Sequence, residues 1–388
     1  MNLKEIVARC EQLYEDLQFS AVKEWKAAAP GRKAIGYMPV YVPHEIIHAA
    51  GMLPVGIFGG GDQIEVIQGD AYYQSYICRI PRSTLELGLT GRLDCLDGML
   101  FPSTCDVIRN LSGMWQIMFK DKYVRYVDVP QNYDDAIGGR FYVHEMQALR
   151  KDLSNVSGTT ITDDALRASI AVYNENRKAV RDLYAYRAQK PWQAPTSEVY
   201  LILRAGCVLP PEQHTDLIMQ YLREAELQQR PRRDNARVVM TGSFCEQPPL
   251  GLIKSIEMAG CYIVDDEFML ALRWLLDDVP TSGDPLQELS KAFLHRSAQS
   301  SSKYDERKED KGKFLLHQVK SRGAEGVVFA APSFCDPALL ERPMLQEILA
   351  RHKVPYTAFK YAENTGQMAP IREQAGTFAD SIKLWSAA

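Results

Sequence analysis

Short apolar runs alternate with amphipathic stretches in two separate parts of the chain. Between residues 33 and 150, helical patterns such as PRSTLELGL separate four apolar runs: KAIGYMPVYV, GMLPVGIFG, DGMLFPS and YVRYVDVP. A similar alternation returns after residue 235, with the runs ARVVMTGSF, CYIVDD, EGVVFAAPSF and VPYTAFKY. Strands that alternate with helices are typical of parallel sheets, so we predict an α/β fold with two Rossmann-like parallel-sheet domains.

The part of the chain between these two domains is predicted to be helical. Its longest periodic stretches are DDALRASIAVYNENRKAVRDLYAYR and QHTDLIMQYLREAELQQR, and the proline-bearing joint KPWQAPTSE lies between them. The start, MNLKEIVARCEQLYEDL, has the spacing of an amphipathic helix. We therefore divide the chain into an N-terminal helix (1–32), a first α/β domain (33–150), a helical connector (151–234) and a second α/β domain (235–388). The strongly charged stretch 286–322 is predicted to be an exposed helix and loop.

Length and charge narrow the class of protein. A chain of 388 residues is long for one hydrophobic core, in agreement with two domains. The net charge of -4, without any basic run, argues against a general affinity for nucleic acid. No stretch approaches the roughly 20 apolar residues that a membrane helix needs, and the acidic start lacks the pattern of a signal peptide. We therefore expect a soluble, cytoplasmic protein.

Three of the eight cysteines share one local pattern. Each follows an apolar run and a Ser-x step and precedes an acidic residue: Cys105 in PSTCD, Cys245 in GSFCE and Cys335 in PSFCD. Open parallel sheets bind ligands where loops leave the carboxyl ends of the strands, so these thiols meet in one cleft if the two sheet edges face one another. The acids that follow are predicted to bind backbone N–H groups of the loops: Asp106, Glu246 and Asp336.

Thiols gathered in a cleft favour a soft metal or an iron–sulfur cluster. Zinc is disfavoured because the sequence has no paired C-x2-4-C knuckle, whereas a rigid fold can gather dispersed cysteines around a 4Fe-4S cluster. Cys78, in YICRIPRSTLE, is a fourth candidate, and N–H groups at the start of the helix that follows it could stabilise the charge of a cluster. From their spacing alone, these four candidates could also be thiols that only fill core space. A packing role is the prediction for the other four cysteines: Cys10, Cys95, Cys207 and Cys261.

Four segments occur in order along most of the chain, from about residue 33 to 375: YVPHEIIHAAGMLPV, YICRIPRS, LDGMLFPSTCDVIRNL and EGVVFAAPSFCDPALLERPML. Together they resemble the benzoyl-CoA reductase and 2-hydroxyacyl-CoA dehydratase family. Within that family the chain looks most like the smaller cluster-bearing subunit (gamma type) of the ATP-dependent class I reductases. The resemblance implies a 4Fe-4S cluster in the cleft between the two domains, held by Cys78, Cys105 and Cys335.

Cys245 departs from this pattern, because the resemblance implies no cysteine there. Either Cys245 is a fourth cluster ligand, or it lines the cleft without binding iron, and we favour the second interpretation. Arg79 and Arg82 follow Cys78 closely, at the start of its helix. They could lower the pKa of its thiol, offset the charge of a cluster or contact CoA phosphates, and the alternative is a solvated helix face.

The resemblance also implies an activity and partners. The implied reaction passes low-potential electrons to the ring of benzoyl-CoA or a related acyl-CoA and gives a cyclohexadiene carbonyl-CoA, in anaerobic aromatic degradation. The implied partners are a paralogous cluster-bearing subunit, two ATPase or activator-type subunits, and ferredoxin as electron donor. The chain itself contains no G-x4-G-K-[ST] loop, in agreement with ATP hydrolysis on other subunits.

Ring reduction also needs protons. His44 and His48 are four residues apart in PHEIIHAAG, so on a helix they share one face and can point into a cleft. His44 is the candidate proton donor, and Glu45, on a neighbouring face, is a second candidate. His48 is predicted to pack within the domain.

Two other functions stay open. The same fold and cluster would serve a 2-hydroxyacyl-CoA dehydratase subunit, in which an electron is recycled and not consumed. A non-catalytic partner subunit, which supplies one wall of a paralogue's active site, is the second. Net electron use per product separates the reductase from the dehydratase, and activity without a cluster in this chain would favour the non-catalytic partner.

Overall fold

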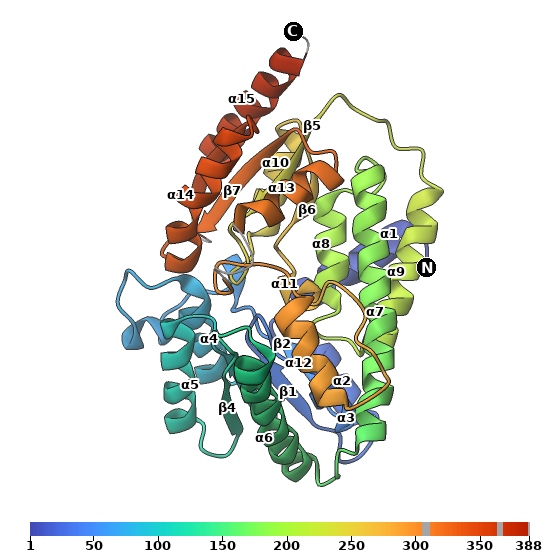
Figure 1. Cartoon of the computed structure of the whole chain (residues 1–388), viewed down its shortest axis with the longest axis vertical. Coiled ribbons are helices and arrows are strands. Elements are labelled where there is room, and N and C mark those ends of the chain that lie inside the picture. Colours follow the sequence, from blue (N-terminus) through green and yellow to red (C-terminus); the bar gives the residue numbers. More distant parts are fainter. Residues whose placement is uncertain (305–310, 363–367, 387–388) are drawn as a thin grey trace.

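Two four-stranded parallel sheets form the two halves of the molecule (Figure 1). The computed structural model describes residues 1–304, 311–362 and 368–386. The first sheet has the strand order β2-β1-β3-β4 and the second has the order β6-β5-β7-β8, and every pairing is parallel. The predicted α/β class with two Rossmann-like sheets is thus confirmed, whereas the predicted domain boundaries stay predictions.

The strands are short and helices surround them. The strands are β1 (Ala34–Tyr37), β2 (Leu53–Gly56), β3 (Gly98–Pro102), β4 (Tyr123–Val127), β5 (Ala236–Thr241), β6 (Cys261–Asp266), β7 (Gly326–Pro332) and β8 (Tyr356–Tyr361). The helices are α1 (Leu3–Glu15), α2 (Ser20–Ala27), α3 (His44–Ala49), α4 (Arg79–Leu89), α5 (Asp106–Met118), α6 (Arg140–Ser157), α7 (Asp163–Gln189), α8 (Thr196–Ala205), α9 (Pro211–Glu226), α10 (Leu250–Met258), α11 (Leu270–Arg273), α12 (Pro285–His295), α13 (Lys311–Ser321), α14 (Asp336–Arg351) and α15 (Met368–Ser386). Two 3-10 turns, η1 (Gly61–Gln63) and η2 (Gly69–Tyr72), and a π-helical turn, η3 (Asp135–Gly139), complete the elements named here.

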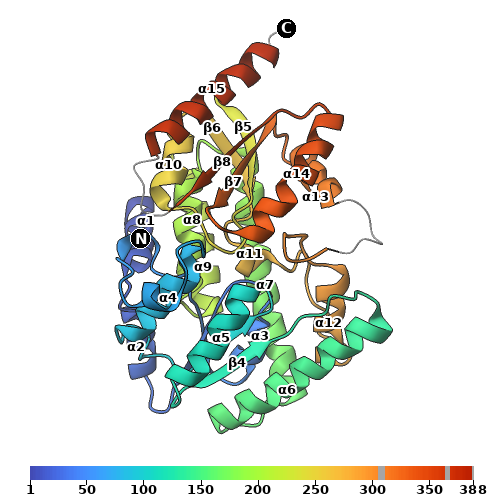
Figure 2. The ribbon, with the colours of Figure 1, turned by 90° about the vertical axis from the view of Figure 1, so that its left-hand side faces the viewer.

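The order of the strands brings the cysteine loops together. In each sheet the order of the strands reverses at the first strand, because β1 lies between β2 and β3, and β5 lies between β6 and β7. Loops that leave neighbouring strands toward opposite faces create a crevice at such a point. Cys105 follows β3, while Cys245 and Cys335 follow β5 and β7. Figure 2 shows α4 and α5 of the first half facing α14 of the second half across the middle of the molecule.

The central strands are buried on both faces. All residues of β3 and β7 are buried, whereas the edge strands β4 and β8 keep partly exposed positions. Parallel strands that helices cover on both sides read as nearly continuous apolar runs. The runs GMLFP and GVVFAAP have this character, which is why the sequence pattern located these strands.

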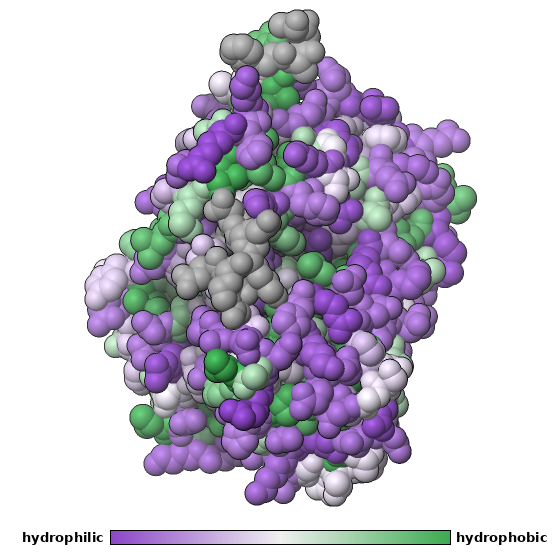
Figure 3. Space-filling model, in the orientation of Figure 1, coloured by the Kyte–Doolittle hydropathy of each residue, from purple (hydrophilic) through white to green (hydrophobic). Residues whose placement is uncertain are grey.

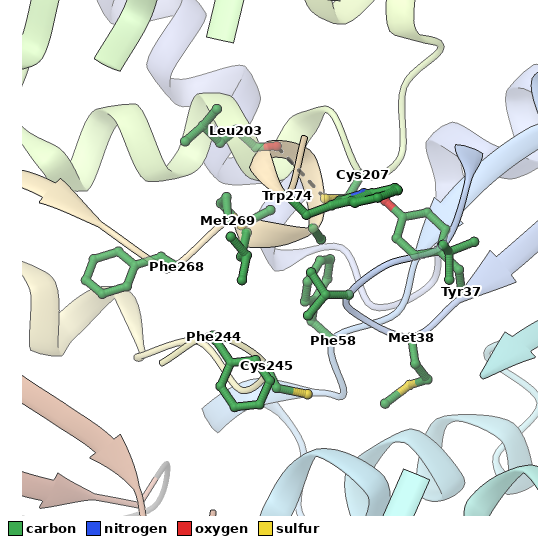
Figure 4. Close-up of a cluster of buried hydrophobic side chains, with 14 of the residues drawn as sticks. Tyr37, Met38, Phe58, Leu203, Cys207, Phe244, Cys245, Phe268, Met269 and Trp274 are labelled. Atoms are coloured by element: carbon green, nitrogen blue, oxygen red, sulfur yellow. Dashed lines mark hydrogen bonds between the residues drawn. The ribbon is translucent and has the colours of Figure 1, made fainter. Parts of the chain in front are cut away.

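One hydrophobic core continues across the junction between the two halves (Figure 4). Tyr37 and Phe58 come from the first half, Leu203 from the helical connector, and Phe244 and Trp274 from the second half. Separation of the halves would expose these side chains to water, so burial of apolar surface favours the joined arrangement.

The helical connector differs from the prediction by one helix. The joint KPWQAPTSE does not link two helices directly, because α8 begins within it at Thr196. Nearly all of α8 is buried, and it packs against α1, α10 and α9. The start of α8 lies inside the proline-bearing joint, so the pattern did not separate this helix from the joint.

The longest helix, α7, is fixed to both halves. It packs against α3 of the first half and β6 of the second. Arg177 of α7 forms a buried ion pair with Glu45 of α3, and Arg187 forms one with Asp266 of β6. This helix therefore connects the two sheets rigidly on one side of the molecule.

The charged stretch 286–322 also differs from its prediction. The prediction of an exposed helix is wrong for α12, which buries Leu286, Leu289 and Phe293. This helix packs against η3 and α6, so a segment late in the sequence returns to the first half. Residues 305–310 of this stretch lie outside the described residues.

Hydrophilic residues dominate the face of the molecule in Figure 3, and apolar residues form small separate groups on it. Within the described residues, no helix has both the length and the apolar character needed to cross a bilayer.

Candidate functional site: a cavity lined by four cysteines

Four cysteines line one cavity between the two halves. The cavity has a volume of about 340 Å³, and its walls come from the loops after β3, β5 and β7 and from the start of α4. Cys78, Cys245 and Cys335 are each less than a tenth exposed, and Cys105 is partly buried. The predicted meeting of these thiols in one cleft is therefore observed. The other lining residues are Ile80, Thr104, Asp106, Val107, Ile108, Phe244, Glu246, Ser301, Phe334, Asp336, Pro337 and Leu340.

Three of the four cysteines occupy the same position relative to a helix. Cys78 is the N-cap residue of α4, Cys105 that of α5 and Cys335 that of α14. The first turn of a helix has backbone N–H groups without an intrahelical partner and a partial positive charge. Three such helix starts meet at the cavity, an arrangement that suits a negatively charged occupant.

Backbone N–H groups donate hydrogen bonds to two of these sulfurs. Burial raises the pKa of the Cys105 thiol, and hydrogen bonds from the N–H groups of Ile108 and Val107 oppose this rise. Burial also raises the pKa of Cys335, to about 12, and a hydrogen bond from the N–H group of Ala338 opposes this rise. The starts of α5 and α14 thus favour the thiolate, which is the form that binds a metal.

The start of α4 is different. From the sequence, its N–H groups were candidates to stabilise the charge of a cluster beside Cys78. Instead, the carboxylate of Glu246 accepts a hydrogen bond from the N–H group of Ile80 at 3.1 Å, and the N–H group of Arg79 also binds this carboxylate. Glu246 is 3% exposed and belongs to the second half. The predicted binding of Glu246 to backbone N–H groups is therefore observed, but across the cleft.

The four sulfurs lie close enough to influence one another. Burial is the largest cause that raises the pKa of the Cys78 and Cys245 thiols, and the other cysteines of the cavity raise it further. Several thiolates in one buried place repel one another unless positive charge compensates them. A metal centre would supply that charge and bind the deprotonated sulfurs.

The donor set fits an iron–sulfur cluster better than a single metal ion. Among the described residues, no three histidine, cysteine, aspartate or glutamate side chains converge on one ion. A 4Fe-4S cluster has a different requirement, because each cysteine binds a different iron and the sulfurs surround a larger space. The hydroxyl of Thr104, on the cavity wall beside the Cys105 thiol, is also buried without a well-formed hydrogen bond. Such a group fits an occupant with acceptor atoms, and the inorganic sulfides of a cluster are of this kind.

Cys245 lies on the wall but not at a helix start. It belongs to the loop between β5 and α10, and its thiol donates a weak hydrogen bond to the carbonyl oxygen of Pro39 at 3.8 Å. Pro39 follows β1, so Cys245 contacts the first half, and Figure 4 shows its sulfur directed toward Met38. Both predicted roles, the fourth ligand and the cleft residue, stay predictions.

His44 and Glu45 lie in another layer and not on the cavity wall. The ring of His44 packs against Tyr37 with 4.2 Å between centroids, and burial lowers its pKa to about 4. The carboxylate of Glu45 pairs with Arg177 at 2.5 Å. The partner of Glu45 is therefore structural, and the predicted proton transfer by either residue stays untested. The ring of His48 bonds the Ser169 hydroxyl of α7 and lies 3.3 Å from a carboxylate oxygen of Glu212 in α9, so it packs against the helical connector.

Arg79 and Arg82 bind neighbouring loops. The guanidinium of Arg79 donates hydrogen bonds to the carbonyl oxygens of Gly61 and Ile64. The guanidinium of Arg82 pairs with Asp70 at 2.8 Å. Neither arginine is on the cavity wall, and their observed contacts fasten residues 61–64 and η2 to α4.

Two aromatic residues and a threonine on the wall were not predicted. Phe244 and Phe334 occupy the same place in the two Ser-Phe-Cys motifs, but Phe244 is 2% exposed and Phe334 is 50% exposed. The repeated phenylalanine was the sequence signal that could have located both. No signal distinguished Thr104 from other polar residues at the ends of strands. The remaining cysteines pack in the core or at its edge, as predicted: Cys10, Cys95, Cys207 and Cys261.

Two opposed parallel sheets with a cysteine-lined cavity at their carboxyl edges define an α/β protein with a candidate ligand site between its halves. The chain belongs to the family described as 2-hydroxyglutaryl-CoA dehydratase, D-component, whose model matches residues 39–382. The family resemblance inferred from the four ordered segments is thereby confirmed.

Three relatives illustrate the range of this family. The chain is 65% identical to a benzoyl-CoA reductase subunit of Thauera aromatica over 386 residues, which cover 100% of each chain. It is 30% identical to the beta subunit of (R)-2-hydroxyglutaryl-CoA dehydratase of Acidaminococcus fermentans, over 92% of this chain and 94% of the relative. It is 27% identical to the beta subunit of lactoyl-CoA dehydratase of Anaerotignum propionicum, over 98% of both. The chain is therefore a subunit of the reductase and dehydratase type.

Proposed function

We propose that this chain is the iron–sulfur subunit of an ATP-dependent, ferredoxin-linked benzoyl-CoA reductase. The observation that carries the proposal is its 65% identity, over both full lengths, to a protein named as a subunit of benzoyl-CoA reductase. In the proposed reaction the complex passes low-potential electrons to the ring of an aromatic acyl-CoA and gives a cyclohexadiene carbonyl-CoA.

Cys78, Cys105 and Cys335 are the proposed ligands of a 4Fe-4S cluster. Their common position at helix starts supports this set, because backbone N–H groups at the starts of α5 and α14 donate hydrogen bonds to the sulfurs of Cys105 and Cys335 and oppose the rise in pKa that burial causes. A bound cluster supplies one-electron transfer at a very negative potential. The chain holds the three sulfurs on two rigid halves, so the cavity is closed only when both halves are in place.

Cys245 is proposed to be a residue of the cleft and not a cluster ligand. It differs from the other three because it follows β5 without a helix start of its own, and its thiol already bonds Pro39. One iron would then be open to a ligand that is not a cysteine. Such an iron is the site at which a substrate or a water could bind.

The apolar wall of the cavity supports low-potential chemistry. Ile80, Ile108 and Phe244 are almost fully buried and form part of the lining. Side chains of this kind keep water away from reactive intermediates and strengthen the electrostatic interactions around the site.

The rim of the cavity supports a role within a complex. Phe334 and Leu340 line the cavity, yet they are 50% and 78% exposed. Exposed apolar side chains around a site favour contact with another protein. The proposed partners are a paralogous cluster-bearing subunit, which shares the acyl-CoA site, and two ATPase subunits that receive electrons from ferredoxin, in the cytoplasm.

Iron analysis of cysteine variants tests the proposal. The protein is purified anaerobically, and iron, sulfide and the EPR signal of the reduced protein are measured. About four irons per chain are expected, with loss of iron in Cys78→Ala, Cys105→Ala and Cys335→Ala. The matched control is Cys261→Ala, because Cys261 is fully buried in the second half and does not line the cavity.

The outcome for Cys245→Ala separates its two proposed roles. Retention of the cluster with a changed EPR spectrum supports a cleft residue, and loss of iron supports a fourth ligand. No iron in a folded, anaerobically prepared wild-type chain would refute the cluster and with it the redox function.

The second candidate function is that of a 2-hydroxyacyl-CoA dehydratase subunit. The 30% identity to the beta subunit of (R)-2-hydroxyglutaryl-CoA dehydratase favours it. Electron consumption by the reconstituted complex decides between the two, because the reductase uses electrons for each product and the dehydratase recycles them. Full activity with a cluster-free variant of this chain would instead support a non-catalytic partner role.

A further inference from the structure

Glu246 is a buried carboxylate that joins the two halves at the cavity. It follows β5 of the second half, and its Oε2 atom accepts a hydrogen bond from the backbone N–H group of Ile80 in the first half at 3.1 Å. The N–H group of Arg79 also binds this carboxylate. Glu246 therefore acts as a helix cap for α4, although it is 166 residues away in the sequence.

The capped helix carries one cysteine of the cavity. Cys78 is the N-cap residue of α4, but its own side chain makes no capping hydrogen bond. Without Glu246, the first N–H groups of α4 would lose the acceptor that now binds them. The position of the Cys78 sulfur thus depends on a residue of the opposite half.

Glu246 is itself held in place. The hydroxyl of Tyr361, on β8, donates a hydrogen bond to the backbone oxygen of Glu246 at 2.7 Å, and it is also 3.2 Å from the Ser243 hydroxyl. Its chain neighbour Cys245 contacts the first half through Pro39. The second sheet therefore presents the carboxylate to α4 in a fixed position.

We propose that Glu246 is a positioning residue, which holds Cys78 at the correct distance from Cys105 and Cys335 by capping α4 across the cleft. Cys105 lies in the same half as Cys78, but Cys335 lies in the other. A cluster that binds all three cysteines needs the two halves in a fixed relative position, and Glu246 fixes this position near Cys78. The effect of Glu246 on a cluster rests on the proposed function, whereas the cap of α4 by Glu246 does not depend on a cluster.

Hydrogen exchange of the cluster-free protein tests the cap. The amides of Arg79 and Ile80 are expected to exchange about tenfold faster in Glu246→Ala than in the wild type, because a lost helix cap removes about that factor of protection. Glu246→Gln is expected to restore slow exchange, since its amide oxygen can accept the same hydrogen bonds. Glu246→Asp, one methylene shorter, provides a second loss variant if the alanine variant does not fold.

Glu257 provides the matched control. Its carboxylate is largely buried in the same half and accepts a hydrogen bond from the N–H group of Ser197, in the first turn of α8, at 3.3 Å. Glu257 does not line the cavity. Glu257→Ala is therefore expected to speed exchange at the start of α8 and to leave the amides of Arg79 and Ile80 unchanged.

The loaded protein tests the consequence for the cluster. Release of iron to a chelator is expected to be at least several-fold faster in Glu246→Ala, with a shifted EPR spectrum, and Glu246→Gln is expected to return both toward the wild type. Unchanged exchange at α4 in Glu246→Ala and Glu246→Asp would overturn the cap. Equally fast iron release in Glu257→Ala would overturn the positioning role. A wild-type chain without iron would refute the proposed function, while the exchange result would still decide whether Glu246 caps α4.

Discussion

The carboxylate of Glu45 and the guanidinium of Arg177 form an ion pair of 2.5 Å in which the side chains are only 2% and 7% exposed. Glu45 belongs to α3 and Arg177 to α7, and Arg177 also donates a hydrogen bond to Asn174 at 2.7 Å. Ten residues further along α7, Arg187 pairs with Asp266 at 2.6 Å. One helix is thereby fixed to the first half at one point and to the second half about 15 Å further on.

Replacement of Glu45 is expected to lower stability more than it alters chemistry. Glu45→Ala leaves the buried charge of Arg177 without a partner, so the free energy of unfolding should fall by about 3–5 kcal/mol. Denaturant unfolding of the cluster-free protein measures this change. Asp182→Ala is the control, because Asp182 pairs with Lys178 on the exposed face of the same helix and should show no measurable change. Normal stability together with lost turnover in Glu45→Ala would support the catalytic role that the sequence predicted.

Two buried histidines are expected to make stability depend on pH. Burial lowers the pKa of His44 and of His214 to about 4, whereas in the unfolded chain the pKa is about 6.5. Between these values the unfolded chain binds protons that the folded chain does not. Stability should therefore fall as the pH drops from about 6.5 to about 4, by about 1.4 kcal/mol per pH unit for each histidine.

Unfolding of the cluster-free protein at several pH values checks this slope. His214→Gln should reduce it, since the ring of His214, which bonds Ile202 and Asn176, is then absent. His352→Gln, at an exposed position, should leave the slope unchanged. Equal slopes in the wild type and in His214→Gln would contradict the assignment.

The two Ser-Phe-Cys motifs are expected to respond differently to substitution. Phe334 has a φ of 68°, a left-handed conformation that costs about 1 kcal/mol for a residue other than glycine, and half of its side chain is exposed. Phe334→Gly should therefore change the free energy of unfolding by less than about 1 kcal/mol. Phe244→Ala should cost about 3–5 kcal/mol, because Phe244 is fully buried. If Phe334 contributes to a partner surface, Phe334→Gly should weaken assembly of the complex in spite of its normal stability.

The hydroxyl of Thr104 is expected to raise the reduction potential of a bound cluster. Burial raises the pKa of the Cys105 thiol, and the Thr104 hydroxyl is among the groups that oppose this rise. Hydrogen bonds to cluster sulfurs raise the reduction potential, so Thr104→Val should lower the potential of the loaded protein and keep its iron content. A redox titration followed by EPR measures the change. Thr84→Val, a buried threonine that does not line the cavity, is the control and should leave the potential unaltered.

The strands and the cysteine cavity were predictable because each depends on a local pattern. Strands such as β3 and β7 are buried on both faces and read as apolar runs, and the Ser-x-Cys motif marks where β3, β5 and β7 end. Parallel strand order then brings those ends to one edge. The meeting of the thiols followed from this topology on the condition that the two sheet edges face one another, which the structure shows.

The parts that were missed depend on contacts between distant segments. Nearly all of α8 is buried against segments that are distant in the sequence, and α12 buries its apolar face against a half that no local pattern identifies. The cap of α4 by Glu246 joins residues 166 positions apart. The ion pair of Glu45 with Arg177, on another helix, likewise depends on a contact between distant segments.

The position of α7 determines how the molecule can open. In Figure 1, α7 runs along the side of the molecule opposite α14, whose start forms part of the cavity wall. The ion pairs of Arg177 and Arg187 fix both halves at α7, so any relative movement of the halves would be a rotation about an axis near that helix. In such a rotation the displacement of an atom grows with its distance from the axis. A partner that presses on the far rim would then change together the distances from Cys78 and Cys105 to Cys245 and Cys335, while the spacing of the sulfurs within each half would stay the same.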